Sequence, residues 1–108
     1  MNSEPVATFA LSAKKPSFIS AKLFTAPHEA YVWLTDFYVH PDYQKKGIGK
    51  KCMKAIRKIA RSREVDWVRF DAYDAEAGAS GFYLKCGCSL IGRATANGTK
   101  LHVFEIRA

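Results

Sequence analysis

A basic amphipathic segment between two apolar runs constrains the fold of this chain more than any other feature. Residues 30–39 (AYVWLTDFYV) are rich in β-branched and aromatic residues and stop at His40-Pro41, which predicts a strand buried on both faces. Residues 67–73 (WVRFDAY) predict a second strand. A strand, a helix and a strand of this length indicate parallel strands joined by a right-handed crossover. The sequence therefore predicts an α/β fold.

The segment between the two runs predicts a helix with one apolar and one basic face. The helix is expected to begin near Gly47, and its apolar residues recur at spacings of three and four. No acidic residue follows Lys45 until Glu64, so positive charge is concentrated on this element. The apolar face holds Ile48, Cys52, Ala55, Ile56 and Ile59, and the cations are Lys45, Lys46, Lys50, Lys51, Lys54, Arg57, Lys58, Arg61 and Arg63.

Apolar runs and turn signals in the rest of the chain predict further strands and one short helix. The pair Asn97-Gly98 lies between the last two of these strands and predicts a tight hairpin turn. The strands are expected over residues 5–11, 17–24, 89–96 and 100–106, and the helix over residues 76–86.

Composition fits one compact domain over residues 1–108. Of the 108 residues 48% are hydrophobic, which is enough for a single core. No apolar run approaches the about 20 residues of a membrane span, and the start lacks signal-peptide features, so we expect a soluble, cytoplasmic protein. The net charge of +7 suggests an anionic ligand or partner, or else a solvated basic surface. The three cysteines, Cys52, Cys86 and Cys88, lack the second Cys/His pair of a zinc site, so we expect reduced packing thiols and no metal.

The loop HPDYQKKGIGKK, residues 40–51, brings glycines to the start of the basic helix. A glycine-bearing loop that enters a helix N-terminus presents several free backbone N–H groups to one point, which suits a phosphate. The P-loop pattern does not fit, because Gln44 stands where its first glycine belongs and Lys51 where Ser or Thr is required. The dinucleotide-binding fingerprint lacks its third glycine, which is Cys52 here, and a long loop precedes its first. A different anion-binding pattern is therefore needed.

The spacing of Gln44, Gly47 and Gly49 resembles the acyl-coenzyme A signature of the GNAT superfamily of N-acetyltransferases, Gln/Arg-x-x-Gly-x-Gly/Ala. The overlapping residues 34–41 (LTDFYVHP) are similar to the fourth strand of that family, and residues 77–88 (AGASGFYLKCGC) to its later A-x-x-F-Y-x-K-x-G-F helix. Two separate segments thus match in the right order, which makes the resemblance specific.

The resemblance implies a GNAT-like α/β fold, with a mixed, mostly antiparallel sheet, a central splayed parallel strand pair and flanking helices. The family normally places one strand and two helices before the point that matches Val6. We therefore expect residues 1–108 to form a single, N-terminally shortened GNAT-like acetyltransferase domain. Those elements usually cover part of the sheet, so a second subunit is expected to cover the apolar N-terminal residues in a homodimer. These residues are Phe9, Leu11, Phe18, Ile19, Leu23 and Phe24.

The resemblance also implies acetyl-CoA as the cofactor and indicates its binding residues. In this family the backbone amides of the signature loop hold the coenzyme A pyrophosphate, and the glycines allow its close approach or unusual φ values. Pantetheine runs along the fourth strand, where a backbone N–H can face the thioester carbonyl. The matching residues are Phe37, Tyr38 and Val39 for pantetheine and Gln44, Lys45, Lys46, Gly47, Ile48, Gly49, Lys50 and Lys51 for the phosphates.

Two side chains are the candidate catalytic residues. Tyr83 matches the family tyrosine whose phenol protonates the leaving thiolate, and core packing beside Phe82 is the alternative. Asp36 is the first candidate for the general base, because a carboxylate inside an apolar strand is costly unless a function or a partner explains it. The alternative for Asp36 is a carboxylate that faces solvent or bonds to a neighbouring backbone N–H. Further candidates for the base are Asp71, Asp74 and His40.

The predicted function is an N-acetyltransferase that transfers the acetyl group of acetyl-CoA to a primary amine by direct attack. An acyl-CoA-binding or protein-interaction module without turnover is the alternative, and turnover separates the two. The basic helix also fits a nucleic-acid-binding domain, which a steep salt dependence of binding would reveal. The sequence leaves the acceptor open between a small-molecule amine and a protein amine.

Overall fold

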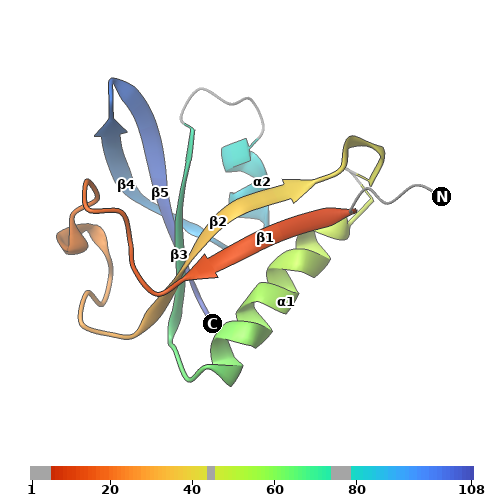
Figure 1. Ribbon diagram of the computed structural model, residues 1–108, viewed down its shortest axis with the longest axis horizontal. Helices are drawn as coiled ribbons and strands as arrows, with labels where there is room; N and C mark the ends of the chain where they lie inside the picture. The colour runs from red at the N-terminus through yellow and green to blue at the C-terminus, as the bar shows by residue number, and fades with distance from the viewer. Residues whose placement is uncertain (1–5, 44–45, 74–78) are drawn as a thin grey trace.

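Figure 1 shows the computed structural model, which describes residues 6–43, 46–73 and 79–108. Its elements are β1 (Ala7–Ser12), the 3₁₀ helix η1 (Ala21–Leu23), β2 (Tyr31–Val39), the 3₁₀ helix η2 (Pro41–Tyr43), α1 (Ile48–Ser62), β3 (Trp67–Tyr73), α2 (Ala79–Lys85), β4 (Ser89–Ala96) and β5 (Thr99–Arg107). The five strands form one sheet in the order β1-β2-β3-β5-β4, in which β2 and β3 are parallel and the other neighbours are antiparallel. The predicted mixed, mostly antiparallel sheet with a central parallel pair is confirmed.

The β2-α1-β3 unit lies where the sequence pattern predicts it, and α1 begins directly after Gly47. Gly47 has a φ of 80°, a left-handed conformation that favours glycine. The buried residues of α1 are Met53, Ile56 and Ala60, whereas Ala55, which the spacing assigns to the apolar face, is exposed. The apolar face is therefore turned slightly from the predicted one. None of the described helices is long and apolar enough to cross a membrane.

The C-terminal hairpin is confirmed together with its turn. Between β4 and β5, Asn97 and Gly98 have φ values of 49° and 78°. Two successive positive φ values are typical of the type I′ turn, for which an Asn-Gly pair is favoured. The helix predicted over residues 76–86 is observed as α2, and residues 76–78 lie outside the described part of the chain.

The strand predicted over residues 17–24 is wrong. These residues belong to the connecting segment, residues 13–30, which joins β1 to β2 and contains η1. The Ser20 hydroxyl accepts a hydrogen bond from the Lys22 N–H at 3.2 Å and caps this short helical turn. Because a serine side chain can bond to nearby backbone, it competes here with strand pairing.

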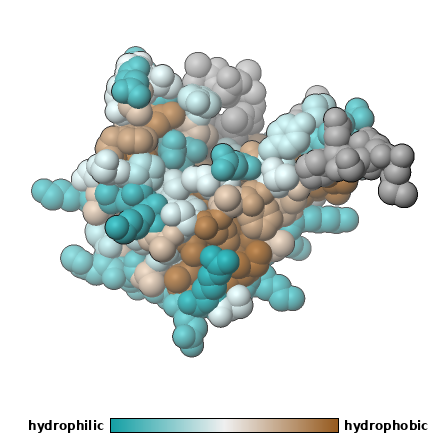
Figure 2. Space-filling model, in the orientation of Figure 1, coloured by the Kyte–Doolittle hydropathy of each residue, from teal (hydrophilic) through white to brown (hydrophobic). Residues whose placement is uncertain are grey.

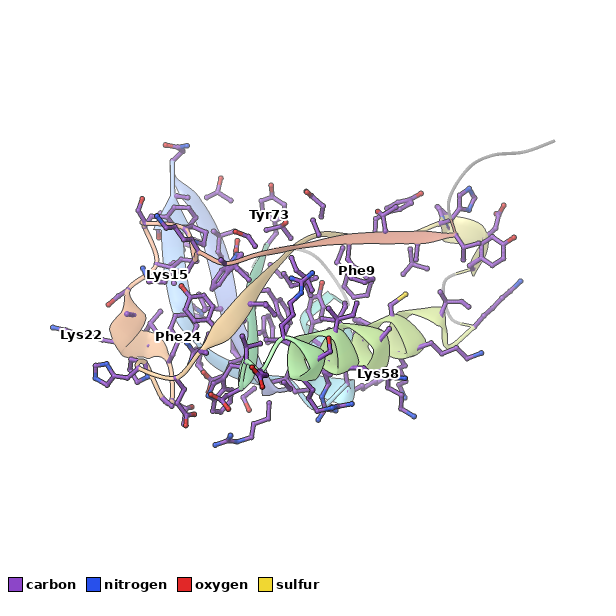
Figure 3. All side chains as sticks on the ribbon, turned by 60° about the horizontal axis from the view of Figure 1, so that its bottom comes forward. Phe9, Lys15, Lys22, Phe24, Lys58 and Tyr73 are labelled. Carbon is purple, nitrogen blue, oxygen red and sulfur yellow. The ribbon has the colours of Figure 1, made fainter. Side chains whose placement is uncertain are left out.

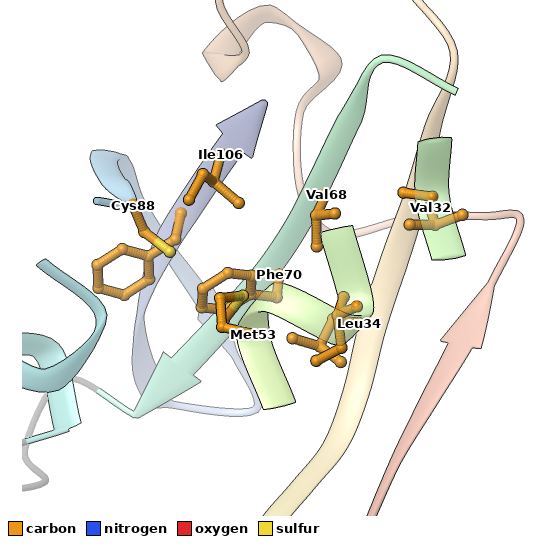
Figure 4. Close-up of a cluster of buried hydrophobic side chains, with 10 residues drawn as sticks. Val32, Leu34, Met53, Val68, Phe70, Cys88 and Ile106 are labelled. Carbon is orange, nitrogen blue, oxygen red and sulfur yellow. The ribbon is translucent and has the colours of Figure 1, made fainter. Parts of the chain in front are cut away.

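Each face of the sheet has its own core. The two α-helices cover one face, where their side chains pack with alternate residues of the central strands. Figure 4 shows the buried residues of this core, with Met53 of α1 together with Leu34 of β2 and Phe70 of β3. The connecting segment covers the other face, where Ile19 and Phe24 pack against Trp33 and Val103. The helix-side core consists of Val32, Leu34, Met53, Ile56, Ala60, Val68, Phe70, Cys88, Phe104 and Ile106.

The chain itself covers most of its apolar N-terminal residues. Ile19 and Phe24 are buried, and Phe9 packs against the helix-side core above α1 (Figure 3). Leu11 packs against the same core and is half-buried. Phe18, by contrast, is 47% exposed. The expectation that a second subunit must cover these residues is therefore wrong for the buried ones, because the connecting segment folds back over the sheet.

A buried arginine holds the connecting segment on the sheet. Arg69 of β3 is 1% exposed, and its Nη2 donates a hydrogen bond to the Ala26 carbonyl at 2.9 Å. Its guanidinium carbon lies 4.4 Å from the ring centroid of Phe24. The Glu105 carboxylate lies 3.7 Å from Arg69 Nε and accepts a hydrogen bond from the Thr25 N–H at 3.2 Å. Burial lowers the pKa of Arg69, and the Glu105 carboxylate opposes that shift.

Candidate functional site

The parallel strands β2 and β3 part in the middle of the sheet. Their register ends at the Trp33–Arg69 pair. β2 continues along β1, and the register of these two strands shifts between Thr8 and Ala10, which marks a β-bulge. Asp36 lies at this bulge with a φ of 54°. The central parallel pair is therefore splayed (Figure 1).

The splay opens a cavity of about 630 Å³ between the two strands. Its walls come from residues 34–37 of β2, residues 70–73 of β3, Tyr83 of α2, the β4–β5 hairpin and Phe18 of the connecting segment. Only residues 32–34 of β2 are buried, so the prediction of a strand buried on both faces is wrong for its second half. The second half borders the cavity because β3 no longer covers it.

Tyr83 lies on the helix side of the cavity. It is half-buried, and its ring centroid is 4.6 Å from that of Phe70. Burial raises the pKa of Tyr83, and negative charge on Cys88, Cys86 or Asp71 would raise it further. The phenol therefore stays protonated at neutral pH and can donate a proton into the cavity.

Two carboxylates, Asp36 and Asp71, are the charged groups among the described residues that line the cavity. Asp36 is exposed at the bulge, where the Thr8 hydroxyl donates to the Asp36 carbonyl at 3.5 Å. The premise that Asp36 lies inside a buried apolar strand is therefore wrong, because the bulge brings it to the surface. It nevertheless borders the same cavity as Tyr83.

Asp71 is half-buried on β3, across the cavity from β2. Burial raises the pKa of Asp71. A hydrogen bond from its own backbone lowers this pKa, as does the indole N–H of Trp33, and both partly oppose the effect of burial. Trp33 is 1% exposed, and its indole N–H makes no hydrogen bond of regular geometry with any described residue. The sequence pattern did not single out Trp33, because its proximity to Asp71 depends on the β2–β3 register.

Of the remaining candidate bases, His40 is not among the described residues that line the cavity. His40 directly follows β2, where its Nδ1 accepts a hydrogen bond from the Asp42 N–H at 3.1 Å and its ring centroid lies 5.9 Å from that of Tyr43. Asp74 lies outside the described residues.

The start of α1 is open to an anion. Gly47 offers no side-chain cap, and the first turn contains no acidic residue. The N–H groups of a first helical turn have no partner within the helix and attract negative charge. Of the predicted phosphate-binding residues, Gly47, Ile48, Gly49, Lys50 and Lys51 lie at this start, Lys46 precedes it, and Gln44 and Lys45 lie outside the described residues.

The two signature glycines differ in conformation and in surroundings. Gly47 adopts a positive φ, whereas Gly49 does not. A Cβ built on Gly49 would lie 2.7 Å from Cζ of Phe82 on α2. An unusual φ value therefore accounts for Gly47 but is wrong for Gly49, where the missing side chain admits the ring of Phe82. Close approach of the diphosphate to these glycines stays a prediction.

Of the predicted pantetheine-binding residues Phe37, Tyr38 and Val39, all of them described, only Phe37 is among those that line the cavity. The ring centroid of Phe37 lies 6.3 Å from that of Phe82 and 6.5 Å from that of Tyr83. Tyr38 and Val39 pair with β1 on the other side of the strand. The strand edge that pairs with β3 in the first half of β2 therefore faces the opening in the second half.

Comparison with known proteins identifies the family. The family model described as acetyltransferase (GNAT) family matches residues 2–88. The chain is similar to spermine/spermidine N(1)-acetyltransferase of Bacillus subtilis, with 32% identity over 76 residues, 69% of this chain and 50% of that protein. It is also similar to glucosamine 6-phosphate N-acetyltransferase of Schizosaccharomyces pombe, with 39% identity over 59 residues, 55% of this chain and 50% of that protein. The chain spans about half the length of the curated relatives it matches.

Solved structures share the fold at low identity. A GNAT-family acetyltransferase from Listeria monocytogenes has a TM-score of 0.70 at 12% identity, over 95% of this chain and 58% of that one. A Bacillus anthracis protein assigned as a streptothricin acetyltransferase and solved with acetyl coenzyme A has a TM-score of 0.66 at 18% identity, over 72% of this chain and 49% of that one. Because the family model spans residues 2–88 and the sheet is GNAT-like, the chain belongs to the acetyltransferase (GNAT) family.

Proposed function

We propose that this chain transfers the acetyl group of acetyl-CoA to a primary amine by direct attack of the amine nitrogen on the thioester carbon. One observation carries the proposal: a single cavity is lined by the phenol of Tyr83 and by the carboxylates of Asp36 and Asp71. Phe82 connects this cavity to the first turn of α1, since it packs near Phe37 and over Gly49. An acid, a base and a nearby anion-binding helix start are what acyl transfer from coenzyme A requires.

The residues present fit acetyl-CoA. The uncapped first turn of α1, together with Lys46, Lys50 and Lys51, holds the phosphates, and the resemblance adds Gln44 and Lys45. The backbone of residues 37–39 holds pantetheine by sheet-like hydrogen bonds along the open edge of β2. When bound, the coenzyme supplies an activated acetyl thioester.

Two kinds of side chain act on the reaction. Tyr83 donates its proton to the leaving thiolate, and the raised pKa keeps it protonated until then. A carboxylate of the cavity accepts the proton of the amine. The sequence pattern favours Asp36 as this base. Burial favours Asp71, because it raises the pKa of that carboxyl. A backbone N–H of β2 stabilises the negative charge that develops on the carbonyl oxygen.

A small cationic amine suits the acceptor side of the cavity. The chain carries a net charge of +7, yet the charged residues lining the cavity are acidic among those described. Such a cavity attracts an ammonium group and repels a phosphate-bearing acceptor. The name of one relative, spermine/spermidine N(1)-acetyltransferase, specifies acceptors of this kind. A protein amine is the alternative acceptor.

Thiol release tests the function. The protein is incubated with acetyl-CoA and a panel of diamines, monoamines, amino sugars and a peptide with a free N-terminus, and the acetylated product is identified by mass. We expect release that depends on a small amine. Binding of acetyl-CoA without release for any acceptor would instead support an acyl-CoA-binding module. Salt-dependent binding of DNA that coenzyme A does not displace would support a nucleic-acid-binding domain.

A homodimer through the β1 side of the sheet is also part of the proposal. β1 is an edge strand, and Figure 2 shows apolar residues gathered over β1 and α1 on one face of the molecule. An exposed strand edge beside apolar surface is the kind of feature that a second subunit covers. Phe18, exposed and at the cavity, is the residue through which a partner could affect the acceptor.

A further inference from the structure

Trp33 and Asp71 lie where β2 and β3 part. Trp33 forms the last pair of the parallel register with Arg69, and Asp71 is two residues beyond Arg69 on β3. Because side chains alternate along a strand, Asp71 projects from the same face as Arg69, which the connecting segment covers. The intervening Phe70 projects to the helix side and contacts Tyr83. The cavity therefore has a phenol on one face of the sheet and a carboxylate on the other.

The indole N–H of Trp33 is a buried donor beside this carboxylate. Trp33 is 1% exposed, and within the part of the chain that the structure describes its Nε1–H makes no hydrogen bond of regular geometry, which is an unfavourable state for a buried donor. It still acts on the Asp71 carboxyl, whose pKa it lowers against the effect of burial. Trp67 provides a contrast, because its Nε1 donates to Glu29 Oε1 at 2.6 Å. The indole N–H of Trp67 is thus hydrogen-bonded to a carboxylate, whereas the indole N–H of Trp33 acts on the Asp71 carboxylate without a regular hydrogen bond.

We infer that Asp71 accepts the proton of the attacking amine and that the indole N–H of Trp33 positions the Asp71 carboxylate for this step. The inference rests on the proposed acetyl transfer. Asp36 borders the same cavity but lies exposed at the bulge, where solvent surrounds it. Asp71 is instead half-buried and has a protein donor at hand.

The surroundings of Asp71 suit a general base. A base is most effective when its pKa lies near the operating pH, and burial moves the pKa of Asp71 in that direction. Asp71 pairs with Val103 of β5, its charge acts on Tyr83 of α2, and it shares the cavity with Asp36 on β2, Tyr73 on β3 and Phe18 of the connecting segment.

The proton and bond changes balance. Asp71 takes one proton from the ammonium group, and the freed lone pair forms the bond between nitrogen and the acetyl carbon. The carbon–sulfur bond breaks, and its electron pair leaves on sulfur, to which Tyr83 donates a proton. The nitrogen loses its second proton as the amide forms, and that proton restores Tyr83. Asp71 returns its proton to water, so that an ammonium and a thioester give an amide, a thiol and one proton.

The indole N–H resonances test the contact without turnover. The chain contains two tryptophans, so a ¹⁵N-labelled sample gives two indole signals to follow against pH. The Trp33 signal should shift as Asp71 ionises, and Asp71→Asn should abolish this shift. The Trp67 signal, which reports on Glu29, should keep its wild-type position and so show that the variant is folded. A Trp33 titration that is unchanged in Asp71→Asn would rule out the contact.

Steady-state kinetics test the proton transfer. Asp71→Asn should lower kcat/KM for the amine by about 10²- to 10⁴-fold and remove the low-pH limb of its pH profile, while acetyl-CoA still binds. Asp36→Asn removes the same charge from the same cavity and should retain that limb. Trp33→Phe removes a donor that favours the carboxylate, so the limb should move to higher pH. A merely structural role of Trp33 would lower activity without moving the limb.

The outcomes separate the inference from the proposed function. Acetyl transfer that keeps its rate and its low-pH limb in Asp71→Asn would overturn the inference and leave the proposed function standing. Absence of transfer from every amine by the wild-type protein would overturn the proposed function, and with it the role of Asp71 as a base.

Discussion

Phe82 of α2 occupies the space that a β-carbon at Gly49 of α1 would need, because its Cζ lies 2.7 Å from that position. Carbon atoms that are not bonded to each other do not approach so closely, so a side chain at this glycine must displace the ring. The start of α1, where we propose that phosphate binds, and the helix that carries Tyr83 are thereby held in one arrangement.

Gly49→Ala should destabilise the protein and weaken both acetyl-CoA binding and turnover. The added methyl group displaces Phe82, whose ring centroid is 5.3 Å from that of Tyr83. Overpacking of this kind costs about 1–3 kcal/mol in the free energy of unfolding. Chemical denaturation and calorimetry with acetyl-CoA measure the two effects. Gly49→Glu would be a poorer test, because it adds a negative charge as well as a clash.

Gly81→Ala is the matched control for this packing effect. A methyl group on Gly81 of α2 would meet no atom of the described residues within 4 Å, so alanine should be neutral or should stabilise by up to about 1 kcal/mol through helix propensity. Combining Gly49→Ala with Phe82→Leu should recover part of the lost stability. Equal losses from Gly49→Ala and Gly81→Ala would contradict the contact as the cause.

Tyr83→Phe should lower turnover by about 10- to 10⁴-fold and leave acetyl-CoA affinity nearly unchanged. The phenol must be protonated to act, and burial raises its pKa above the ordinary value of 10.0. The wild-type kcat should therefore show no loss from Tyr83 ionisation as the pH rises toward that value. A pH–rate profile and calorimetry of the variant provide both measurements. A turnover rate that Tyr83→Phe leaves unchanged would show that Tyr83 packs in the core and does not act as the acid.

Asp71→Asn should stabilise the folded protein at neutral pH. Burial raises the folded-state pKa of Asp71 above its ordinary value of 3.8, so the ionised carboxylate disfavours the folded state. This cost is complete above the folded-state pKa, shrinks as the pH falls through it and vanishes below the ordinary value. The gain should thus appear in thermal melts at about pH 7 and be lost near pH 3. Asp42→Asn, at a side chain that is 83% exposed, should show no such pH-dependent gain.

Arg69→Ala should lower the free energy of unfolding by about 3–5 kcal/mol, because it leaves the buried Glu105 carboxylate without its partner. The loss should loosen the connecting segment, which Arg69 holds through Ala26. Urea denaturation and limited proteolysis of that segment measure the effect. Replacing both charges, as Arg69→Met with Glu105→Gln, should cost less than Arg69→Ala.

Arg61→Ala is the control for removing an arginine. Arg61 is exposed on α1, and its loss should change stability by less than about 0.5 kcal/mol. A similar loss in Arg61→Ala and Arg69→Ala would show that the buried contacts of Arg69 contribute nothing measurable.

Light scattering at micromolar concentration should give a mass near twice 12.1 kDa. Phe18→Asp should shift the protein toward the monomer if this exposed side chain lies at the interface, whereas the buried Phe24 offers no surface to a partner. A monodisperse mass of 12.1 kDa with full activity would exclude the dimer.

Elements with a clear local period were predictable, and the connecting segment was not. The strand and helix periods around Gly47 and the Asn97-Gly98 turn act through neighbouring residues, so the sequence alone locates them. Residues 17–24 have no such period, and Ile19 and Phe24 gain their burial from strands that are distant in the chain. Local propensity therefore favoured a strand where tertiary packing formed a covering segment.

The same distinction applies to the candidate site. Motifs and strand chemistry indicate Tyr83 and Asp36, and both line the cavity. The approach of Trp33 to Asp71 requires the register of two strands. The approach of Phe82 to Gly49 requires the packing of two helices, which no residue pattern within either helix encodes.

The bulge at Asp36 changes which residues of β2 face the helices, from even-numbered residues before it to odd-numbered residues after it. Ahead of it the even-numbered residues Val32 and Leu34 pack in the helix-side core, and after it the odd-numbered Phe37 packs against that same core. Deleting one residue here would turn Phe37 away from α2 and bring Tyr38 inward, although the composition of the strand would hardly change. The side chains that reach the site therefore depend on how many residues β2 has at this point, and not only on which residues they are. A scan of substitutions preserves chain length and would never detect this dependence.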